Sequence, residues 1–193
     1  ADLGGVALGG AIFSVFYWSF YFLRMGTTGL TAQADGADDT AEIQRILIRA
    51  FAIAGLLGLA LFILRDAIAW GGFAVLQGTA DVEEKGARYL LARAWGAPAA
   101  LGAFALSGWL IGLGRNGATL ALYVVFSLTN IGLDLWFVLG LGYGPGGVGA
   151  ATAIAEWVGL AVGLVFVALA LRQQGGWACG ATDRDRLMEP GAL

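Results

Sequence analysis

The stretch ILIRAFAIAGLLGLALFIL, residues 46–64, decides the fold class of this protein. Arg49 is its one charged residue, and the remaining positions are apolar. A helix rises by about 1.5 Å per residue, so about 20 apolar residues cross the hydrocarbon core of a bilayer. The sequence therefore predicts a membrane-spanning helix here.

The composition of the whole chain agrees with this prediction. Of the 193 residues, 59% are hydrophobic and only 13% are charged, and the mean hydropathy is +0.76. A soluble domain of this length does not need so much apolar surface to form its core. Apolar runs of spanning length recur along the sequence, which indicates an all-α polytopic membrane protein.

The apolar runs predict about five transmembrane helices. Their approximate ranges are 3–24, 41–64, 82–113, 118–141 and 148–171. Asp39 and Glu42 have the spacing of a capping box before the second span. Pro98 lies inside the third span, where it removes a backbone donor and predicts a kink. The short connections make successive helices antiparallel neighbours.

Small residues occur at helical spacing within the spans. Examples are GLLGLAL at 55–61 and the pair Gly159 and Gly163. Such residues let helix backbones approach closely in a membrane, so we expect the spans to pack as one bundle.

The basic residues are distributed unequally between the two ends of the predicted bundle. Seven of the 11 lie at one end and four at the other, and the positive-inside rule places the richer end in the cytoplasm. The first group is Arg24, Arg45, Arg49, Arg115, Arg172, Arg184 and Arg186; the second is Arg65, Lys85, Arg88 and Arg93. The polar tail 174–193 is therefore expected to be cytoplasmic.

Several classes of function are disfavoured by composition. The net charge of −3 provides no basic patch for nucleic acid. The sequence has no His and a single Cys, Cys179, which argues against a structural zinc site, an intrachain disulfide and a Cys–His nucleophile. A membrane enzyme is the weakest reading, because no nucleophile–base pair is present. An apolar run follows Ala1 without a signal-peptide layout, so we interpret this end as a cut in a longer protein.

Asp134 and Glu156 are the two acids well inside apolar segments. A carboxylate near the centre of a spanning helix costs about 2.5–3.5 kcal/mol, so it usually faces a cavity or a partner. Asn130 precedes Asp134 by four residues and shares its helix face. Together they offer a carboxyl and an amide to one cavity, which makes them candidates for carrying a proton or for contributing oxygens to a Na⁺ site. Alternatively, Asp134 is neutral and serves helix packing alone.

Other candidate residues have two readings each. Glu156 either lines the cavity or forms a structural hydrogen bond. Arg24 either snorkels to the headgroups or pairs with an interior acid. Gln33, with nearby threonines, lines an inner vestibule or marks where the helix leaves the membrane. Trp136 and Trp157 shape a cavity for aromatic or cationic compounds, or they contact lipid.

Four long stretches resemble one branch of a known transporter family. They are FLRMGTTGLTAQADG (22–36), GAPAALGAFALSGWLIGLGR (96–115), TNIGLDLWFVLGLG (129–142) and GVGAATAIAEWVGL (147–160). In this order they resemble the DinF branch of the multidrug and toxic compound extrusion (MATE) family. The likeness extends from about residue 2 to residue 172.

The resemblance implies a twelve-helix secondary transporter with two six-helix lobes, which expels organic, often cationic or amphipathic, compounds in exchange for H⁺ or Na⁺. The chain would supply helices two to six of the N-terminal lobe in residues 1–173, followed by an inter-lobe linker in 174–193. Helix one and the C-terminal lobe would be partners from the same transporter. Asn130 and Asp134 match the family's helix-five pair, whereas the acid of helix one has no counterpart. The resemblance also implies a bacterial-type inner membrane and no cofactor besides the coupling ion.

Two rival functions stay open at this point. A lipid-linked oligosaccharide flippase of the same superfamily would use a more cationic cavity, whereas the interior here is acidic. A non-transporting scaffold or remnant would account for the missing helices.

Overall fold

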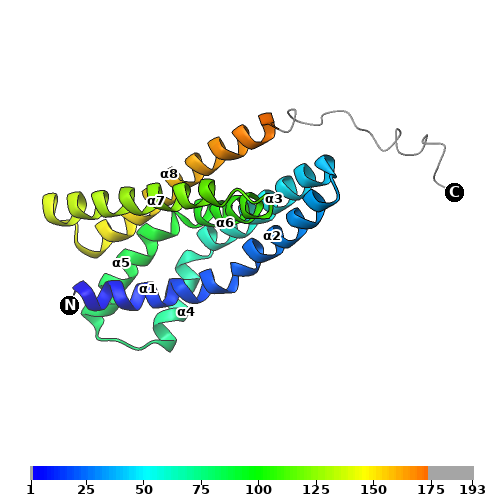
Figure 1. Ribbon diagram of the computed structural model, residues 1–193. Coiled ribbons are helices and arrows are strands. Elements are labelled where there is room, and N and C mark those ends of the chain that lie inside the picture. Colours follow the sequence, from blue (N-terminus) through cyan, green and yellow to red (C-terminus); the bar gives the residue numbers. More distant parts are fainter. Residues whose placement is uncertain (1, 174–193) are drawn as a thin grey trace, which may run out of the picture.

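The computed structural model describes residues 2–173, and this part of the chain is a bundle of helices (Figure 1). In chain order the elements are α1 (Asp2–Ser19), α2 (Tyr21–Gly36), α3 (Thr40–Ile63), α4 (Arg65–Val75), α5 (Ala80–Ala94), α6 (Ala97–Gly112), α7 (Asn116–Asp134), the π-helical segment η1 (Leu135–Gly140) and α8 (Gly144–Gln173). The predicted tail 174–193, with Cys179, Arg184 and Arg186, lies outside the described residues.

The helices combine into five segments that can cross a membrane. Four continuous segments have the necessary length and apolar composition: Asp2–Gly36, Thr40–Ile63, Asn116–Gly140 and Gly144–Gln173. The bent pair α5 and α6 provides the fifth. The prediction of an all-α protein with about five spans is confirmed, although the first span continues through the polar stretch after Arg24 to Gly36.

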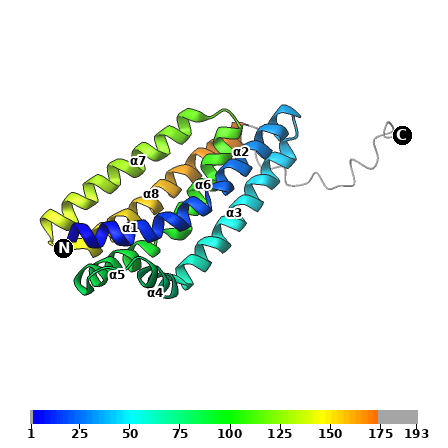
Figure 2. The same ribbon diagram turned by 90° about the horizontal axis from the view of Figure 1, so that it is seen from below.

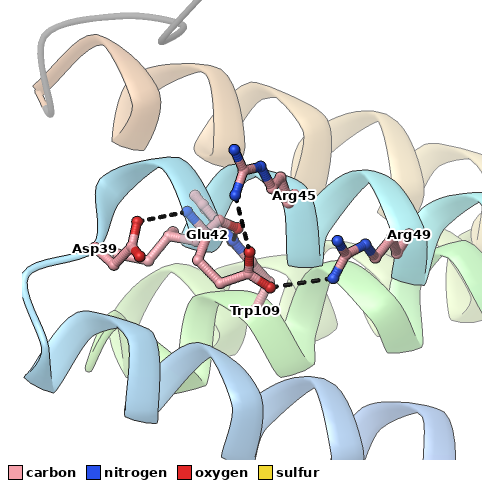
Figure 3. Close-up of polar contacts among 6 residues, drawn as sticks. Asp39, Glu42, Arg45, Arg49 and Trp109 are labelled. Carbon is pink, nitrogen blue, oxygen red and sulfur yellow. Dashed lines mark hydrogen bonds and ion pairs between the residues drawn. The ribbon is translucent and has the colours of Figure 1, made fainter. Parts of the chain in front are cut away.

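The start of α3 is capped as the sequence predicts. Asp39 Oδ1 accepts a hydrogen bond from the backbone N–H of Glu42 over 3.0 Å, which satisfies one of the donors left open at a helix start. The Glu42 carboxylate lies 3.1 Å from Arg49 Nη1 and 3.5 Å from Arg45 Nη1 (Figure 3). Two turns of α3 are thereby joined by charge pairs on its surface.

Helix α6 is the centre of the bundle and contacts α2, α3 and α8 (Figure 2). Leu101, Leu106, Leu110 and Trp109 are each at most 1% exposed. The indole N–H of Trp109 would be costly to bury without a partner, and it donates to the carbonyl of Ile43 over 2.9 Å. This hydrogen bond joins the C-terminal half of α6 to the first turn of α3.

The third span breaks where its proline predicts. The axes of α5 and α6 differ by 53° across residues 95 and 96, and Pro98 occupies the first turn of α6. Proline cannot donate to the carbonyl four residues earlier, here that of Ala94, so a straight helix cannot form through this point. The predicted kink is confirmed.

Glycines sit at the closest helix contacts. A Cβ atom on Gly163 would lie 2.8 Å from Leu122 Cδ1, and a Cβ on Gly58 would overlap the Pro98 backbone. Gly159 approaches Phe126 less tightly, at 3.3 Å. Gly55, in contrast, has no neighbour within 4 Å, so only part of the GLLGLAL pattern serves packing between the described helices.

Successive spans run in opposite directions, as their short connections predict. The α2–α3 turn and the end of α8 lie at one end of the bundle, and the starts of α1 and α8 lie at the other (Figure 1). Arg115 Nη1 donates to Gln173 Oε1 over 2.7 Å, which joins the start of α7 to the end of α8. Arg93 does not lie at the solvent-exposed end of the bundle, because its side chain is only 13% exposed. Its helix, α5, leads from that end into the bundle.

Candidate functional site in the bundle interior

Asn130 on α7 faces Thr152 on α8. The amide Nδ2 of Asn130 donates to Thr152 Oγ1 over 3.2 Å, and Thr152 Oγ1 donates to the Val148 carbonyl over 2.9 Å. Because the threonine hydroxyl hydrogen is used, its oxygen must accept, and the orientation of the Asn130 amide is fixed. The Asn130 carbonyl oxygen therefore points away from Thr152 and is presented to other groups.

Asp134 follows one turn after Asn130 on the same face of α7, as the spacing predicts. Its Oδ1 atom is buried and has no hydrogen-bond partner within residues 2–173. The helix widens directly after Asp134 into η1, where Leu141 N–H bonds to the Trp136 carbonyl five residues earlier. Single π-helical turns often occur at functional sites. An unpaired buried oxygen costs about 1–3 kcal/mol, so this position favours a proton or a cation.

Glu156 on α8 forms a second polar cluster deeper in the bundle. Its side chain is 5% exposed, and its Oε1 atom lies 2.9 Å from Arg93 Nη2 on α5. Tyr17 on α1 donates its hydroxyl to the same oxygen over 3.1 Å. Three helices are thus joined at one carboxylate, because a buried charge needs an opposite charge and hydrogen-bond donors.

The Arg93 guanidinium is also covered by aromatic rings. Its carbon lies 4.6 Å from the centre of the Phe13 ring and 5.4 Å from that of Tyr17, distances at which ring faces attract a cation. The second oxygen of Glu156 has no hydrogen-bond partner in the described part of the chain. This oxygen lies against Gly96, in the space that a Cβ atom would occupy.

A cavity of about 230 Å³ opens beside this cluster, between α1, α6, α7 and α8. Of the described residues that line it, Arg93 and Glu156 are the charged ones. The others are apolar or aromatic: Tyr17, Ala100, Ala103, Phe104, Leu122, Tyr123, Phe126 and Gly159. Phe126 is one turn before Asn130 on α7, and Glu156 is one turn after Thr152 on α8. The cavity and the Asn130–Thr152 contact are therefore successive levels between the same two helices.

The remaining candidates do not line this cavity, although the Arg24 guanidinium carbon lies 6.0 Å from the ring centre of Tyr123, which does. The Arg24 guanidinium donates to the Tyr21 hydroxyl over 3.0 Å and forms no ion pair with any residue from 2 to 173. Gln33 is exposed on α2. Trp136 is 59% and Trp157 47% exposed, and the Trp157 indole donates to the Trp95 carbonyl over 3.1 Å.

Sequence reasoning missed three residues of the site: Arg93, Tyr17 and Thr152. Arg93 belongs to a polar helix with several charges and so resembled a surface residue. Thr152 carried a usable signal, because it precedes Glu156 by four residues in an otherwise apolar segment. Tyr17 carried none, since its partner Glu156 lies 139 residues away in the sequence.

Comparison with known proteins places this arrangement in a family. The MatE family model matches residues 1–136. DNA damage-inducible protein F of Escherichia coli (strain K12) is 39% identical over 173 residues, which cover 90% of this chain and 38% of that protein. The chain thus spans well under half the length of this relative.

Solved structures share the fold at lower sequence identity. A MATE crystal structure in a bent conformation aligns with a TM-score of 0.78 and 24% identity over 90% of this chain and 38% of that one. The lipid II flippase MurJ, in an inward closed conformation, aligns with a TM-score of 0.66 and 22% identity over 84% of this chain and 36% of that one.

The family match covers most of the chain, and the five apolar spans are arranged as in the solved MATE structures. The chain therefore belongs to the MATE family of membrane transporters and is a homologue of DNA damage-inducible protein F.

Proposed function

We propose that this chain is part of a longer transporter that exports small organic compounds, cationic or amphipathic, in exchange for H⁺ or Na⁺. Its partners are then a preceding helix one and a C-terminal lobe of the same protein. The greater length of the relatives supports this. The transporter lies in a bacterial-type inner membrane, with the richer basic end of the bundle and the tail in the cytoplasm.

The observation that carries the proposal is the Oδ1 atom of Asp134, which has no hydrogen-bond partner in the described part of the chain and lies one helical turn from the Asn130–Thr152 contact. Binding of a proton or cation there removes a negative charge from the space between α7 and α8. If the ion binds more tightly to one of two packings of these helices than to the other, its binding shifts the equilibrium toward that packing. The exported compound binds the opposite state, so that ion and compound exchange across the membrane.

Either ion has a chemical basis at this position. A buried carboxyl oxygen without a hydrogen-bond partner among residues 2–173 suits a proton, because protonation removes the cost of burying its charge. Na⁺ prefers oxygen ligands, and Asp134 would supply them together with the Asn130 carbonyl oxygen. Efflux measured in vesicles with a proton gradient alone and with a Na⁺ gradient alone distinguishes the two.

The test is Asp134→Asn in the full-length protein. The amide keeps the size of the side chain but cannot bind a proton or neutralise a cation, so we expect ion-driven efflux of a fluorescent compound to disappear at unchanged membrane expression. Asp35→Asn is the matched control, because Asp35 is an exposed acid at the end of α2, and it should transport as the wild type does.

Two results would contradict the proposal at different levels. Wild-type efflux by Asp134→Asn removes Asp134 from ion coupling. Absence of efflux by the wild type under both gradients rejects export itself and favours the scaffold reading.

A flippase for lipid-linked sugars is the second candidate, favoured by the shared fold with MurJ. The balanced charge of the cavity, with one Arg and one Glu in contact, speaks against a site for a polyanionic headgroup. Translocation of a lipid-linked oligosaccharide in proteoliposomes decides between the two.

A further inference from the structure

One face of α8 packs against α5 and the residue that follows it. A Cβ atom on Gly149 would overlap the backbone of α5, and a Cβ atom on Gly96 would lie 2.8 Å from Ala153 Cα. Glu156 continues this row, because residues 149, 153 and 156 are three or four positions apart and share a helix face. The 2.9 Å contact between Glu156 and Arg93 therefore belongs to the α5 face of α8.

A second face of α8 packs against α7. A Cβ atom on Gly159 would lie 3.3 Å from Phe126 Cβ. Thr152 is seven residues, or about two turns, before Gly159 and so lies in the same row. It accepts the hydrogen bond from the Asn130 amide there. Because Thr152 and Glu156 lie on adjacent faces of one helix, a rotation of α8 about its axis displaces both side chains together.

The apolar surface of α8 does little to fix this rotation. Between residues 148 and 171, the polar side-chain groups are those of Thr152 and Glu156 and the indole N–H of Trp157. Lipid tails are as apolar as the other side chains, so turning such a helix in a membrane changes its hydrophobic free energy little. Breaking a buried polar contact, in contrast, leaves both partners unsatisfied. The polar contacts therefore determine which way α8 faces.

Glu156 is held from two other helices. Its Oε1 atom accepts a hydrogen bond from Tyr17 on α1 and contacts Arg93 on α5, and the Arg93 guanidinium carbon lies 4.6 Å from the ring centre of Phe13. Glu156 Oε2 and Arg93 Nη1 have no hydrogen-bond partner in the described part of the chain. A buried ion pair adds little stability over apolar side chains of similar size, and its best-attested use is to fix how segments are arranged.

We propose that Arg93 and Glu156 are positioning residues for the ion site, because they fix the rotation of α8 and with it the place of Thr152. Thr152 holds the amide of Asn130, whose carbonyl oxygen is then presented on the face of α7 that carries Asp134. Neither Arg93 nor Glu156 contacts the ion in this arrangement. The inference deepens the proposed ion-driven export and rests on it.

The test replaces the three side chains of the cluster together, as Y17F/R93M/E156L in the full-length protein. No buried charge or hydroxyl of the cluster is left without its partner, so we expect the variant to be as stable as the wild type. Efflux of a fluorescent organic cation from vesicles is measured at saturating cation while the concentration of the driving ion, H⁺ or Na⁺, is varied. The concentration for half-maximal efflux should rise by about threefold to tenfold, the weight of one hydrogen bond.

A cross-link reports the position of α8 independently of transport. The 3.3 Å between Phe126 Cβ and a Cβ atom on Gly159 is close to the roughly 3.5–4.5 Å of a disulfide. Phe126→Cys with Gly159→Cys, in a background without other cysteines, should therefore form a disulfide rapidly under mild oxidation. In Y17F/R93M/E156L we expect this reaction to be slower by about threefold or more, because a rotated α8 separates the two thiols.

Arg88→Gln is the matched control for both measurements. Arg88 is on the same helix as Arg93, but its side chain is 67% exposed and pairs with Glu84. Its loss should change neither the ion dependence nor the cross-linking rate. If the triple variant does not reach the membrane, Tyr17→Phe removes one donor to Glu156 without changing any charge, and it should raise the half-maximal ion concentration by about twofold.

The inference is overturned if the triple variant keeps the wild-type ion dependence and cross-linking rate, since a pair that serves stability alone would leave both unchanged. It is also overturned if Arg88→Gln changes them as much. Ion-driven efflux that is absent from the wild type rejects the proposed function, and the cross-linking rates then still decide whether the pair holds α8. Efflux with an unchanged ion dependence in the variant rejects only the present inference.

Discussion

Gly96 lies where α8 crosses the break between α5 and α6. A Cβ atom at this position would overlap Glu156 Oε2 and lie 2.8 Å from Ala153 Cα. Its backbone, with φ −81° and ψ −16°, is open to any residue, so glycine is required by space and not by conformation. The absence of a side chain lets the Glu156 carboxyl reach Arg93 across the break.

We therefore expect Gly96→Ala to destabilise the protein. Overpacking in a tight interior costs about 1–3 kcal/mol, and here it also displaces the carboxyl from its ion pair. Gly55→Ala is the matched control: a Cβ atom on Gly55 would meet no other helix among the described residues within 4 Å, and alanine in a helix interior is favoured over glycine by up to about 1 kcal/mol. Thermal unfolding in detergent, followed by tryptophan fluorescence, compares the two. Equal stability of both variants would mean that α8 does not pack on Gly96 as described.

At the scale of elements, the break between α5 and α6 positions the buried cluster. The 53° bend turns the end of α5, with Arg93, toward α1 and α8, while α6 continues through the centre of the bundle. A straight helix would carry Arg93 along the α6 axis and away from Tyr17. The bend thus places Arg93, in the last turn of α5, inside the bundle.

Pro98→Ala should reduce this bend. Alanine restores the N–H that can bond to the Ala94 carbonyl, so the helix can continue across residues 95 and 96. Spin labels at Glu84→Cys on α5 and Asn116→Cys at the start of α7, in a background without other cysteines, report the separation by pulsed electron paramagnetic resonance. We expect a longer distance in Pro98→Ala than in the labelled parent. An unchanged distance would show that packing against α8 holds the bend without the proline.

At the scale of the whole molecule, the two ends of the bundle differ in charge and in the segments they present. One end holds the α2–α3 turn, the start of α7 and the end of α8; the other holds α4 and the start of α5 (Figure 1). Arg93 is buried and no longer counts toward the second group of basic residues. Three members of that group remain: Arg65, Lys85 and Arg88. Within residues 2–173 the first group has five members, so the excess on which the expected orientation rests is five basic residues against three.

Cysteine labelling checks this orientation in cells. Glu84→Cys is exposed at the start of α5 and should react with a membrane-impermeant maleimide applied from outside the inner membrane. Asn116→Cys, at the opposite end, should react only after that membrane is permeabilised, because the positive-inside rule predicts that Arg115 and its neighbours lie on the cytoplasmic side. The reverse pattern would invert the assigned orientation and move Asp134 to the cytoplasmic half of the bundle.

The sequence by itself determined the features that depend on one segment at a time. The number of spans follows from the length of each apolar run, the bend follows from Pro98, and the cap at α3 follows from Asp39. The shared face of Asn130 and Asp134 follows from helical spacing. These features are local, because a spanning helix satisfies its own backbone hydrogen bonds and needs no other segment to do so.

Only the tertiary structure decided which side chains meet between helices. Tyr17, Arg93 and Glu156 come from α1, α5 and α8, and Thr152 finds Asn130 across the α7–α8 contact. Such meetings depend on how each helix is rotated about its axis and how closely the backbones approach. That approach is set by small residues whose neighbours lie far along the chain, as Gly96 does with Glu156, so no single segment contains the information.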